Sequence, residues 1–390
     1  MELINLGYRV CIAAAFLKDA SEGDEDDDDD KNDEEQKEFG RFLPPEQSES
    51  RPGLIALSNS LAALASKRKQ RRLRSNEPAD NLAELVEEDD IFEWVEQVAP
   101  MFGAILPTFL HCIFFPNKRA PPTRTSFDYP RISQESQVFP SSTSPMLFSF
   151  GCMSPALGGE FYRLYTSASD GLSFNRLMNA LLGYGGPTLL IIQSGKSTFG
   201  AFTASPWKES KDFYGNHDCF LYRLLPGPTA VYRPSGNSER FMYLNSFARS
   251  RGFDRQAHGI GFGGSTEQPR LFLSESFDSC RAGSDDLAFE KGPILAGRID
   301  GGVTSAADEM FEIDNLEVWG IGGTDVVKES LKARKASRDV RQAYINKARK
   351  VDKAAFLDDL RSGMIENKAF AHLDQVQGRD GTCELLGEQK

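Results

Sequence analysis

The sequence predicts an α+β protein built around a two-sheet antiparallel β-sandwich flanked by helices. Nine short apolar segments, rich in β-branched and aromatic residues and separated by glycine and proline, lie between residues 160 and 323, and helical periodicity occurs on both sides of them. Many strands with one inserted helix, residues 172–182, favour a sandwich. The strand candidates are FYRLYTS, TLLIIQ, TFGAFTA, FLYRLL, AVYR, FMYLNS, GIGFGG, RLFLSES and LEVWGIG.

Two of these strands differ in their pattern of apolar residues. Residues 199–204 alternate between two faces, as expected of a strand with one face on a core. Residues 188–193, in contrast, are apolar almost throughout. A continuous apolar run of this length is typical of a strand covered on both faces. The sequence therefore predicts that a second layer packs against the outer face of this strand.

Four segments precede the sandwich. Residues 1–18 form a short helix, 19–50 an acidic disordered tract, 54–115 a helical segment and 116–157 a linker rich in proline and serine. Residues 19–38 hold thirteen acidic and two basic side chains, a local charge of −11 in a chain whose total is −12. The remainder is nearly neutral, so bulk charge gives no reason to expect nucleic-acid binding.

Two segments follow the sandwich domain, which we place at residues 158–323. Residues 325–377 form one or two charged helices, with a second amphipathic piece predicted over residues 354–373 and a break at Gly363, and residues 378–390 form a tail. The first part is charged nearly all round with a narrow apolar stripe, which is typical of an exposed helix on its own domain or of a docking helix for a partner. The candidate partner-binding residues are Lys328, Lys332, Lys335, Arg338, Arg341, Tyr344 and Lys347.

A second basic cluster ends the helical segment. Its sequence KRKQRRLR holds six basic residues among eight. Such a patch is typical of nuclear import or of contact with an anionic membrane, and equally of a solvated helix end. The basic residues are Lys67, Arg68, Lys69, Arg71, Arg72 and Arg74.

Two motifs resemble nucleotide-binding loops but stand in the wrong context. Residues 259–264 satisfy GxGxxG, yet they lead into a strand and not into a helix whose N-terminus could hold phosphate. Residues 194–197, SGKS, lie between two strands and are predicted to be a hairpin turn. We therefore expect no cofactor.

The residue types that carry catalysis or bind metals are sparse. The six cysteines are widely spaced and the chain has four histidines, which argues against a zinc site. We expect no catalytic residue and no metal. The weak polar candidates, for which we expect capping or turn roles, are Ser173, Asp218 and His258. A thiol-dependent redox protein or small enzyme acting through Cys219 or Cys280 is the alternative.

Several blocks of the sandwich resemble the TLDc domain in order and spacing. They are GGPTLLIIQSGKSTFGAFTASPW, FYGNHDCFLYRLLP, VYRPSGNSERFMYLN, HGIGFGG and LEVWGIGG. The resemblance covers residues 158–323 and implies a two-sheet sandwich flanked by helices, without an established reaction. The overall arrangement looks most like the mTOR-associated, lysosomal subgroup of that family. The characteristic positions are Gly186, Phe199, Gly200, Trp207, Glu317 and Trp319.

The resemblance implies a non-enzymatic regulatory protein. The implied roles are oxidative-stress resistance, binding to the cytosolic sector of the vacuolar-type proton pump, and lysosomal growth signalling through a kinase complex. We expect a monomeric, cytoplasmic protein, peripheral at the lysosome or vacuole membrane, because no run approaches the roughly 20 apolar residues of a spanning helix and Glu2 excludes N-myristoylation. A nuclear adaptor that uses the KRKQRRLR patch is a further alternative.

Overall fold

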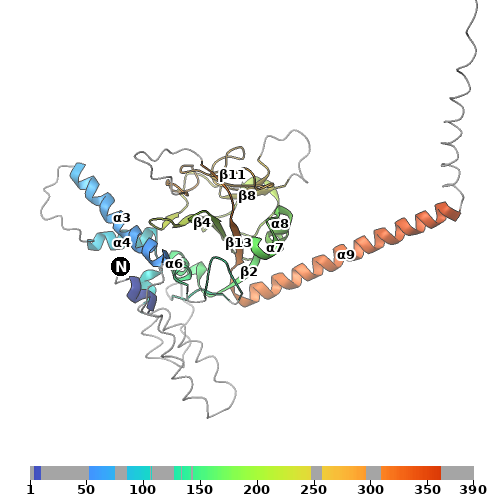
Figure 1. The fold of residues 1–390 in the computed structure, drawn as a ribbon, viewed down its shortest axis with the longest axis horizontal. Helices are drawn as coiled ribbons and strands as arrows, with labels where there is room; N and C mark the ends of the chain where they lie inside the picture. The colour runs from blue at the N-terminus through green and yellow to red at the C-terminus, as the bar shows by residue number, and fades with distance from the viewer. Residues whose placement is uncertain are drawn as a thin grey trace, which may run out of the picture. The chain divides into compact units, whose positions relative to one another are not determined.

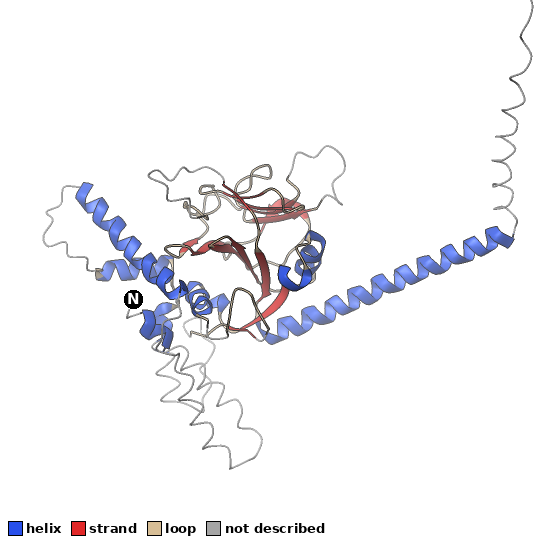
Figure 2. Ribbon diagram, in the orientation of Figure 1, coloured by secondary structure: helices blue, strands red, loops and turns tan. Residues whose placement is uncertain are grey.

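The strands form two stacked sheets, with helices beside them (Figures 1 and 2). The computed structural model describes residues 4–9, 52–74, 86–105, 107, 127–132, 134–141, 144–246, 257–295 and 309–361. The predicted acidic tract and C-terminal tail lie outside the described residues, as does Gly363. The predicted N-terminal helix is described over residues 4–9, which are helical.

The first sheet has the strand order β1-β2-β13-β3-β4-β6-β7. Its pairs are antiparallel, except that β1 runs parallel to β2. The closing strand β13 therefore lies near the centre of the sheet, between β2 and β3. The strands are β1 (Arg131–Ile132), β2 (Glu160–Thr166), β3 (Thr188–Ser194), β4 (Ser197–Thr203), β6 (Phe220–Leu225), β7 (Ala230–Tyr232) and β13 (Asn315–Gly320).

The second sheet has the order β12-β11-β10-β9-β8-β5 and is antiparallel throughout. Neighbours in sequence are neighbours in the sheet over most of its width. The strands are β5 (Ser210–Tyr214), β8 (Met242–Asn245), β9 (Gly259–Phe262), β10 (Leu271–Ser274), β11 (Cys280–Ala282) and β12 (Glu309–Phe311).

All nine predicted strands are confirmed. The four further strands, β1, β5, β11 and β12, lie at or next to a sheet edge. Edge strands keep exposed polar side chains and need little apolar sequence. β5, for example, is half-buried or exposed along its whole length, so its sequence carries no strand signal.

A collar of helices covers the outer face of the first sheet, on the side of β4 in Figure 1. Its apolar side chains form one core with the outward-facing residues of the sheet, including Leu189, Ile191 and Trp319. We define the helical collar as residues 4–9, α3 (Pro52–Arg74), α4 (Glu88–Gln97), η1 (Phe102–Ala104), α6 (Pro145–Met153) and η2 (Pro155–Leu157).

The second core lies between the two sheets. Leu190 and Ile192 of β3 point into it, whereas Leu189 and Ile191 point toward the collar. The prediction that residues 188–193 are buried on both faces is therefore confirmed. The inserted helix is α8 (Phe174–Leu182), which is preceded by the short α7 (Ser167–Asp170) and packs on the same core.

The segment predicted to be a linker contains structured elements. Residues 144–157 form α6 and η2, and seven residues of α6 are buried. The physical reason is local: Ser144 caps the helix by accepting a hydrogen bond from the Met146 amide, and Pro145 occupies the first turn, where its missing N–H costs nothing. The proline- and serine-rich surroundings hid this apolar helix.

The charged helix after the sandwich is α9 (Gly323–Arg361), one helix of 39 residues. It runs past the point where the sequence predicted a second piece to start, near residue 354. The chain divides into two compact units, residues 1–330 and 331–390, so the first two turns of α9 belong to the unit that holds the sandwich.

Candidate interaction site

A buried carboxylate on the closing strand binds a segment that is distant in sequence. Glu317 of β13 is fully buried. The Ser136 hydroxyl donates to its Oε2 at 2.7 Å, the Gln137 amide donates to its Oε1 at 2.8 Å, and the Trp319 indole Nε1 donates to Oε2 at 3.0 Å. We call these four residues the Glu317 cluster. All donors reach a charged acceptor, which makes the hydrogen bonds strong.

The Glu317 cluster fixes the segment between β1 and α6. The Ser136 hydroxyl oxygen also accepts from the amides of Val138 and Phe139, at 3.0 and 2.9 Å. The Phe139 ring then packs between Phe150 of α6 and Trp319 of β13, with both centroid distances at 5.9 Å. The cluster thereby joins the collar to the sheet, and its carboxylate is fully buried.

The other characteristic positions are also structural. Phe199 is buried and meets Phe311 edge to face at 5.0 Å, across the two sheets. Gly200 pairs with Ile191 in the first sheet. The Trp207 indole donates to the Thr188 hydroxyl at 2.8 Å. Gly186 precedes β3 and packs against Val326 in the first turns of α9, a contact described below.

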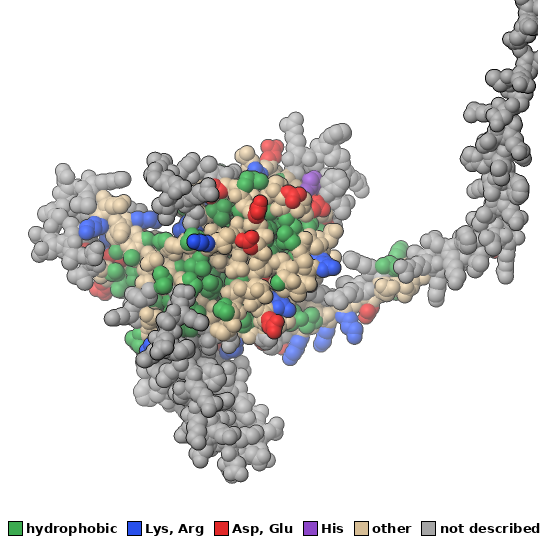
Figure 3. Space-filling model, viewed as in Figure 1, with side chains coloured by type: hydrophobic (Ala, Val, Ile, Leu, Met, Phe, Trp, Pro, Cys, Tyr) green, Lys and Arg blue, Asp and Glu red, His purple; other side chains and the backbone are tan. Residues whose placement is uncertain are grey.

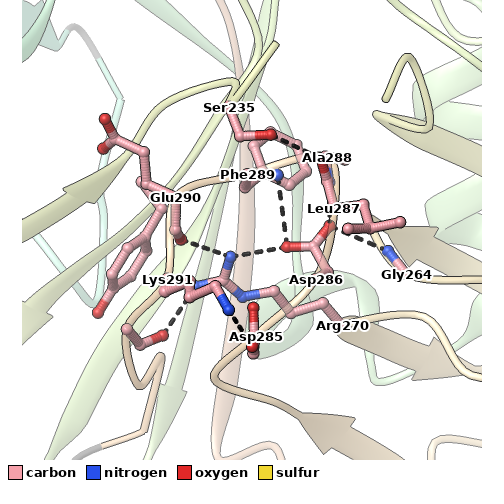
Figure 4. Close-up of polar contacts among 12 residues, drawn as sticks. Ser235, Gly264, Arg270, Asp285, Asp286, Leu287, Ala288, Phe289, Glu290 and Lys291 are labelled. Atoms are coloured by element: carbon pink, nitrogen blue, oxygen red, sulfur yellow. Dashed lines mark hydrogen bonds and ion pairs between the residues drawn. The ribbon is translucent and has the colours of Figure 1, made fainter. Parts of the chain in front are cut away.

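A buried ion pair holds the loop of residues 283–295. Nη1 of Arg270 lies 2.8 Å from Oδ1 of Asp286, and their side chains are 0% and 1% exposed. The Arg270 guanidinium also donates to the carbonyls of Glu290 and Gly292, both at 2.7 Å. Figure 4 shows the guanidinium enclosed by this loop. Its face lies on the Tyr232 ring at 4.7 Å.

The carboxylate of Asp286 also binds the backbone of the loop. It accepts from the amides of Gly264, Ala288 and Phe289 at 3.1, 2.9 and 3.4 Å. The Ser235 hydroxyl in turn donates to the Leu287 carbonyl at 2.6 Å. The loop backbone is therefore fixed while the Leu287 side chain stays 69% exposed. A rigid loop that presents an apolar side chain suits a binding surface.

The glycine motif of residues 259–264 serves sheet packing. β9 is an interior strand between β8 and β10. The Tyr243 ring lies across Gly261, where an added Cβ would sit 2.2 Å from the ring carbon Cε1. SGKS likewise forms the predicted hairpin, with Ser194 paired to Ser197. Neither motif precedes a helix that could hold phosphate.

The weak polar candidates take local roles. Ser173 is the N-cap residue of α8, without a side-chain capping hydrogen bond, and its amide donates to the Tyr165 hydroxyl at 3.2 Å. Asp218 closes a turn with Asn216 at 3.3 Å. The His258 carbonyl accepts from the Glu275 amide at 3.0 Å. Among the described residues, no group of three or more potential ligands is placed to bind a metal ion.

The described cysteines, Cys152, Cys219 and Cys280, are buried free thiols. Burial raises the pKa of the Cys219 and Cys280 thiols, although hydrogen bonds from nearby groups partly oppose this. Burial also raises the pKa of Cys152. The nucleophile and the redox-active species is the thiolate, so a raised pKa disfavours thiol chemistry at neutral pH.

We expect Cys219 and Cys280 of the folded protein to react with iodoacetamide at least about tenfold more slowly than in the urea-unfolded chain at the same pH. Because the pKa values of both thiols are raised, the reaction should accelerate only at pH values above the pKa of an ordinary thiol, about 8.5. Mass spectrometry of the labelled peptides measures both rates. Fast labelling of either folded thiol at neutral pH would support the redox alternative.

The basic patch lies on the last turns of α3. Arg68 forms ion pairs with Glu87, Asp89 and Asp90 at 3.5, 3.3 and 3.2 Å, which ties it to α4. Lys67 is exposed and Lys69 is half-buried. Arg71, Arg72 and Arg74 are helical, but their side chains lie outside the described residues. Arg68 is therefore bound within the collar, which reduces the charge that the patch offers to a partner.

The predicted docking helix α9 exposes its described basic side chains, as the Lys and Arg side chains along its start in Figure 3 show. Its apolar residues Val340 and Tyr344 are 68% and 77% exposed. They are four residues apart and so share a face. The exposed basic candidates are Lys328, Lys332, Lys335 and Lys347; the side chains of Arg338 and Arg341 lie outside the described residues.

Arg270 and Asp286, which fix the loop of residues 283–295, were not among the predicted site residues. Asp286 carried a weak local signal, since an aspartate in a loop often bonds the backbone amide two residues on in an Asx turn. Arg270 carried a weaker one, as a lone charge in front of the apolar strand β10. Their pairing joins two turns and had no signal in the sequence.

Comparison with known proteins identifies the sandwich. The family model for the TLDc domain matches residues 132–322. That region starts before the predicted boundary of residue 158 and includes the second residue of β1, the Ser136 segment and α6, in agreement with their packing on the sheet. The match ends one residue before α9 begins.

Individual relatives align over less than half of the chain. mTOR-associated protein MEAK7 of Danio rerio is 29% identical over 178 residues, 45% of this chain and 36% of the relative. MEAK7 of Homo sapiens is 29% identical over 163 residues, covering 41% and 32%. Oxidation resistance protein 1 of Xenopus laevis is 35% identical over 164 residues, covering 42% and 16%.

The chain thus aligns with about a third of the length of the MEAK7 relatives. The residues that the family model matches include the whole Glu317 cluster. The predicted resemblance is confirmed at this level: residues 132–322 of this protein form a TLDc domain.

Proposed function

We propose that this protein is a non-enzymatic regulator that acts by binding, with the TLDc domain as a rigid scaffold and α9 as the principal contact. The proposed partner is the cytosolic sector of the vacuolar-type proton pump. The observation that carries the proposal is the exposure of α9, which presents exposed lysines together with the exposed Val340 and Tyr344.

The chemistry of the domain supports a binding role. Its buried charged groups Glu317, Arg270 and Asp286 are held in structural hydrogen bonds and an ion pair. The described thiols are buried. The relatives are named for association with mTOR and for oxidation resistance, and those names state no reaction.

The physical properties of α9 suit recognition of an acidic surface. Positive charge along the helix accelerates encounter with such a surface. Val340 and Tyr344 then supply the apolar contact that sets the register, and a tyrosine offers large contact area at low entropic cost. Exposed lysines alone would contribute little affinity, because exposed ion pairs are weak. The apolar pair is therefore the part to test.

A growth-signalling kinase complex is the second candidate partner, because several relatives are named mTOR-associated. Both candidates imply a location at the cytosolic face of the lysosome or vacuole membrane, by peripheral contact. Within the described residues, no helix combines the length and the apolar character needed to cross a bilayer.

We expect removal of residues 331–390 to abolish co-purification with the purified cytosolic sector of the pump while leaving thermal unfolding of the sandwich unchanged. The deletion starts at Leu331 because Val326 and Ser330 pack on the domain. Circular dichroism and a pull-down on the immobilised sector measure the two properties.

A point variant sharpens this test. The double substitution Val340→Ala/Tyr344→Ala should weaken binding at least about tenfold, since it removes the apolar contact. Its matched control is Gln342→Ala/Asn346→Ala, which removes an exposed polar pair from the same turns of the helix. Equal binding of the two variants, or full binding after the deletion, would contradict the proposed role of α9.

A further inference from the structure

α9 leaves the TLDc domain through a corner of two glycines. Gly322 and Gly323 both have positive φ, 119° and 84°, and the helix starts at the second of them. Glycine carries more conformational freedom than any other residue. A helix that follows two of them would swivel freely unless its first turns were held.

The first two turns of α9 are held on the domain. Ser330 is 7% exposed, and its hydroxyl oxygen accepts a hydrogen bond from the Gly185 amide at 3.3 Å. Val326, one turn earlier, packs on Gly186, where an added Cβ would lie 2.7 Å from Val326 Cγ1. Because 326 and 330 are four residues apart, both side chains lie on one face of the helix.

The surface under that face is itself fixed by hydrogen bonds to the end of β13. The Tyr184 hydroxyl donates to the Ile321 carbonyl at 2.6 Å. The Ile321 amide donates to the Pro187 carbonyl at 2.9 Å. Tyr184 and Ile321 are 2% and 1% exposed. We call Tyr184–Pro187 together with Val326 and Ser330 the α9 seat.

We propose that Val326 and Ser330 are positioning residues of the partner-binding helix: the α9 seat holds the first turns on the TLDc domain, so that domain and helix bind the partner as one unit. The proposal rests on the proposed function, because it takes α9 as the helix that binds. These residues act through the domain and not through contact with the partner.

We expect the seat to raise the affinity for the partner through preorganisation of the helix. A helix held at its base loses less freedom on binding than one attached through two free glycines. Release of the seat should therefore lower affinity without removing any contact to the partner.

The test uses the same two substitutions in two contexts. In the full chain, Val326→Ala/Ser330→Ala should weaken binding to the purified cytosolic sector of the pump about tenfold. In a synthetic peptide of residues 323–361, the same substitutions should leave binding unchanged within about twofold, because the peptide has no seat. Glu329→Ala, an exposed neighbour, is the control in both contexts.

Two outcomes overturn the proposal. Equal weakening of peptide and full chain would make Val326 and Ser330 direct partner contacts. Unchanged binding of the full-chain variant would make the seat irrelevant to recognition.

A readout without partner separates this proposal from the proposed function. Hydrogen exchange of the free full chain should show the amides of residues 326–330 protected more strongly than those of residues 338–346, and the double substitution should remove the difference. If the wild-type chain fails to bind the pump while this protection is present, the proposed function is wrong and the seat stands. If the protection is missing, the seat is wrong whatever the chain binds.

Discussion

Replacement of Glu317 by glutamine is expected to destabilise the TLDc domain by about 2–3 kcal/mol, and so to lower its melting temperature by roughly 5–10 °C. Glutamine keeps the shape of the side chain and removes its charge. The buried position leaves no water to replace the lost hydrogen bonds.

The reason lies in the donors around the carboxylate. The Gln137 amide donates to one oxygen, and the Trp319 indole and the Ser136 hydroxyl donate to the other. A glutamine amide group must point its NH₂ at one of these positions. The Gln137 amide and the indole cannot become acceptors, so in either orientation one donor is left without its partner.

The Ser136 hydroxyl cannot accept a hydrogen bond from the NH₂ group of the glutamine. Its hydroxyl oxygen already accepts from the amides of Val138 and Phe139. Differential scanning calorimetry of Glu317→Gln measures the loss, and Glu312→Gln, an exposed residue five positions earlier, is the control. A melting temperature of Glu317→Gln equal to that of the control would show that the cluster adds nothing to stability.

The sandwich could be predicted because its strands are short, apolar and separated by turn residues. β3 even revealed a third layer, since an uninterrupted apolar strand needs a cover on each face. The collar supplied that cover. Composition misled where one short helix sat inside a polar segment: α6 spans nine residues, too few to change the average of the 116–157 stretch.

The contacts that join distant segments could not be predicted. Glu317 and Ser136 are 181 positions apart. Periodicity tells which face of an element is buried, but it does not tell which distant residue meets it. The family resemblance identified Glu317 and Trp319 as characteristic positions without naming their partners. The α9 seat was hidden for the same reason, because Ser330 meets Gly185 from 145 positions away.

The second large effect is expected at Asp286. The substitution Asp286→Ala should cost about 3–5 kcal/mol, because it leaves the Arg270 charge buried without its counter-ion. It also frees three backbone amides that the carboxylate binds. The neighbouring Asp285 is the matched control. It forms an ion pair with Lys291 at the same 2.8 Å, but those side chains are 51% and 78% exposed.

The two ion pairs have the same N–O distance, so we expect their difference in burial to set how much each contributes to stability. An exposed pair is screened by water, so Asp285→Ala should change the free energy of unfolding by less than about 1 kcal/mol. Urea unfolding followed by tryptophan fluorescence measures both variants. Similar losses for the two would contradict the assignment of Arg270–Asp286 as the anchor of the 283–295 loop.

Removal of both partners distinguishes an ion pair from a hydrogen-bond hub. For an isolated buried pair, an apolar double substitution such as Arg270→Met/Asp286→Leu would restore most of the stability, since no charge stays unpaired. Here the pair also binds the amides of Gly264 and Ala288 and the carbonyls of Glu290 and Gly292. Those groups would lose their partners in the double variant, so we expect it to stay at least about 2 kcal/mol less stable than the wild type. Full recovery would mean that the loop backbone finds other partners, and that the hydrogen bonds of Arg270 and Asp286 to the loop add little to stability.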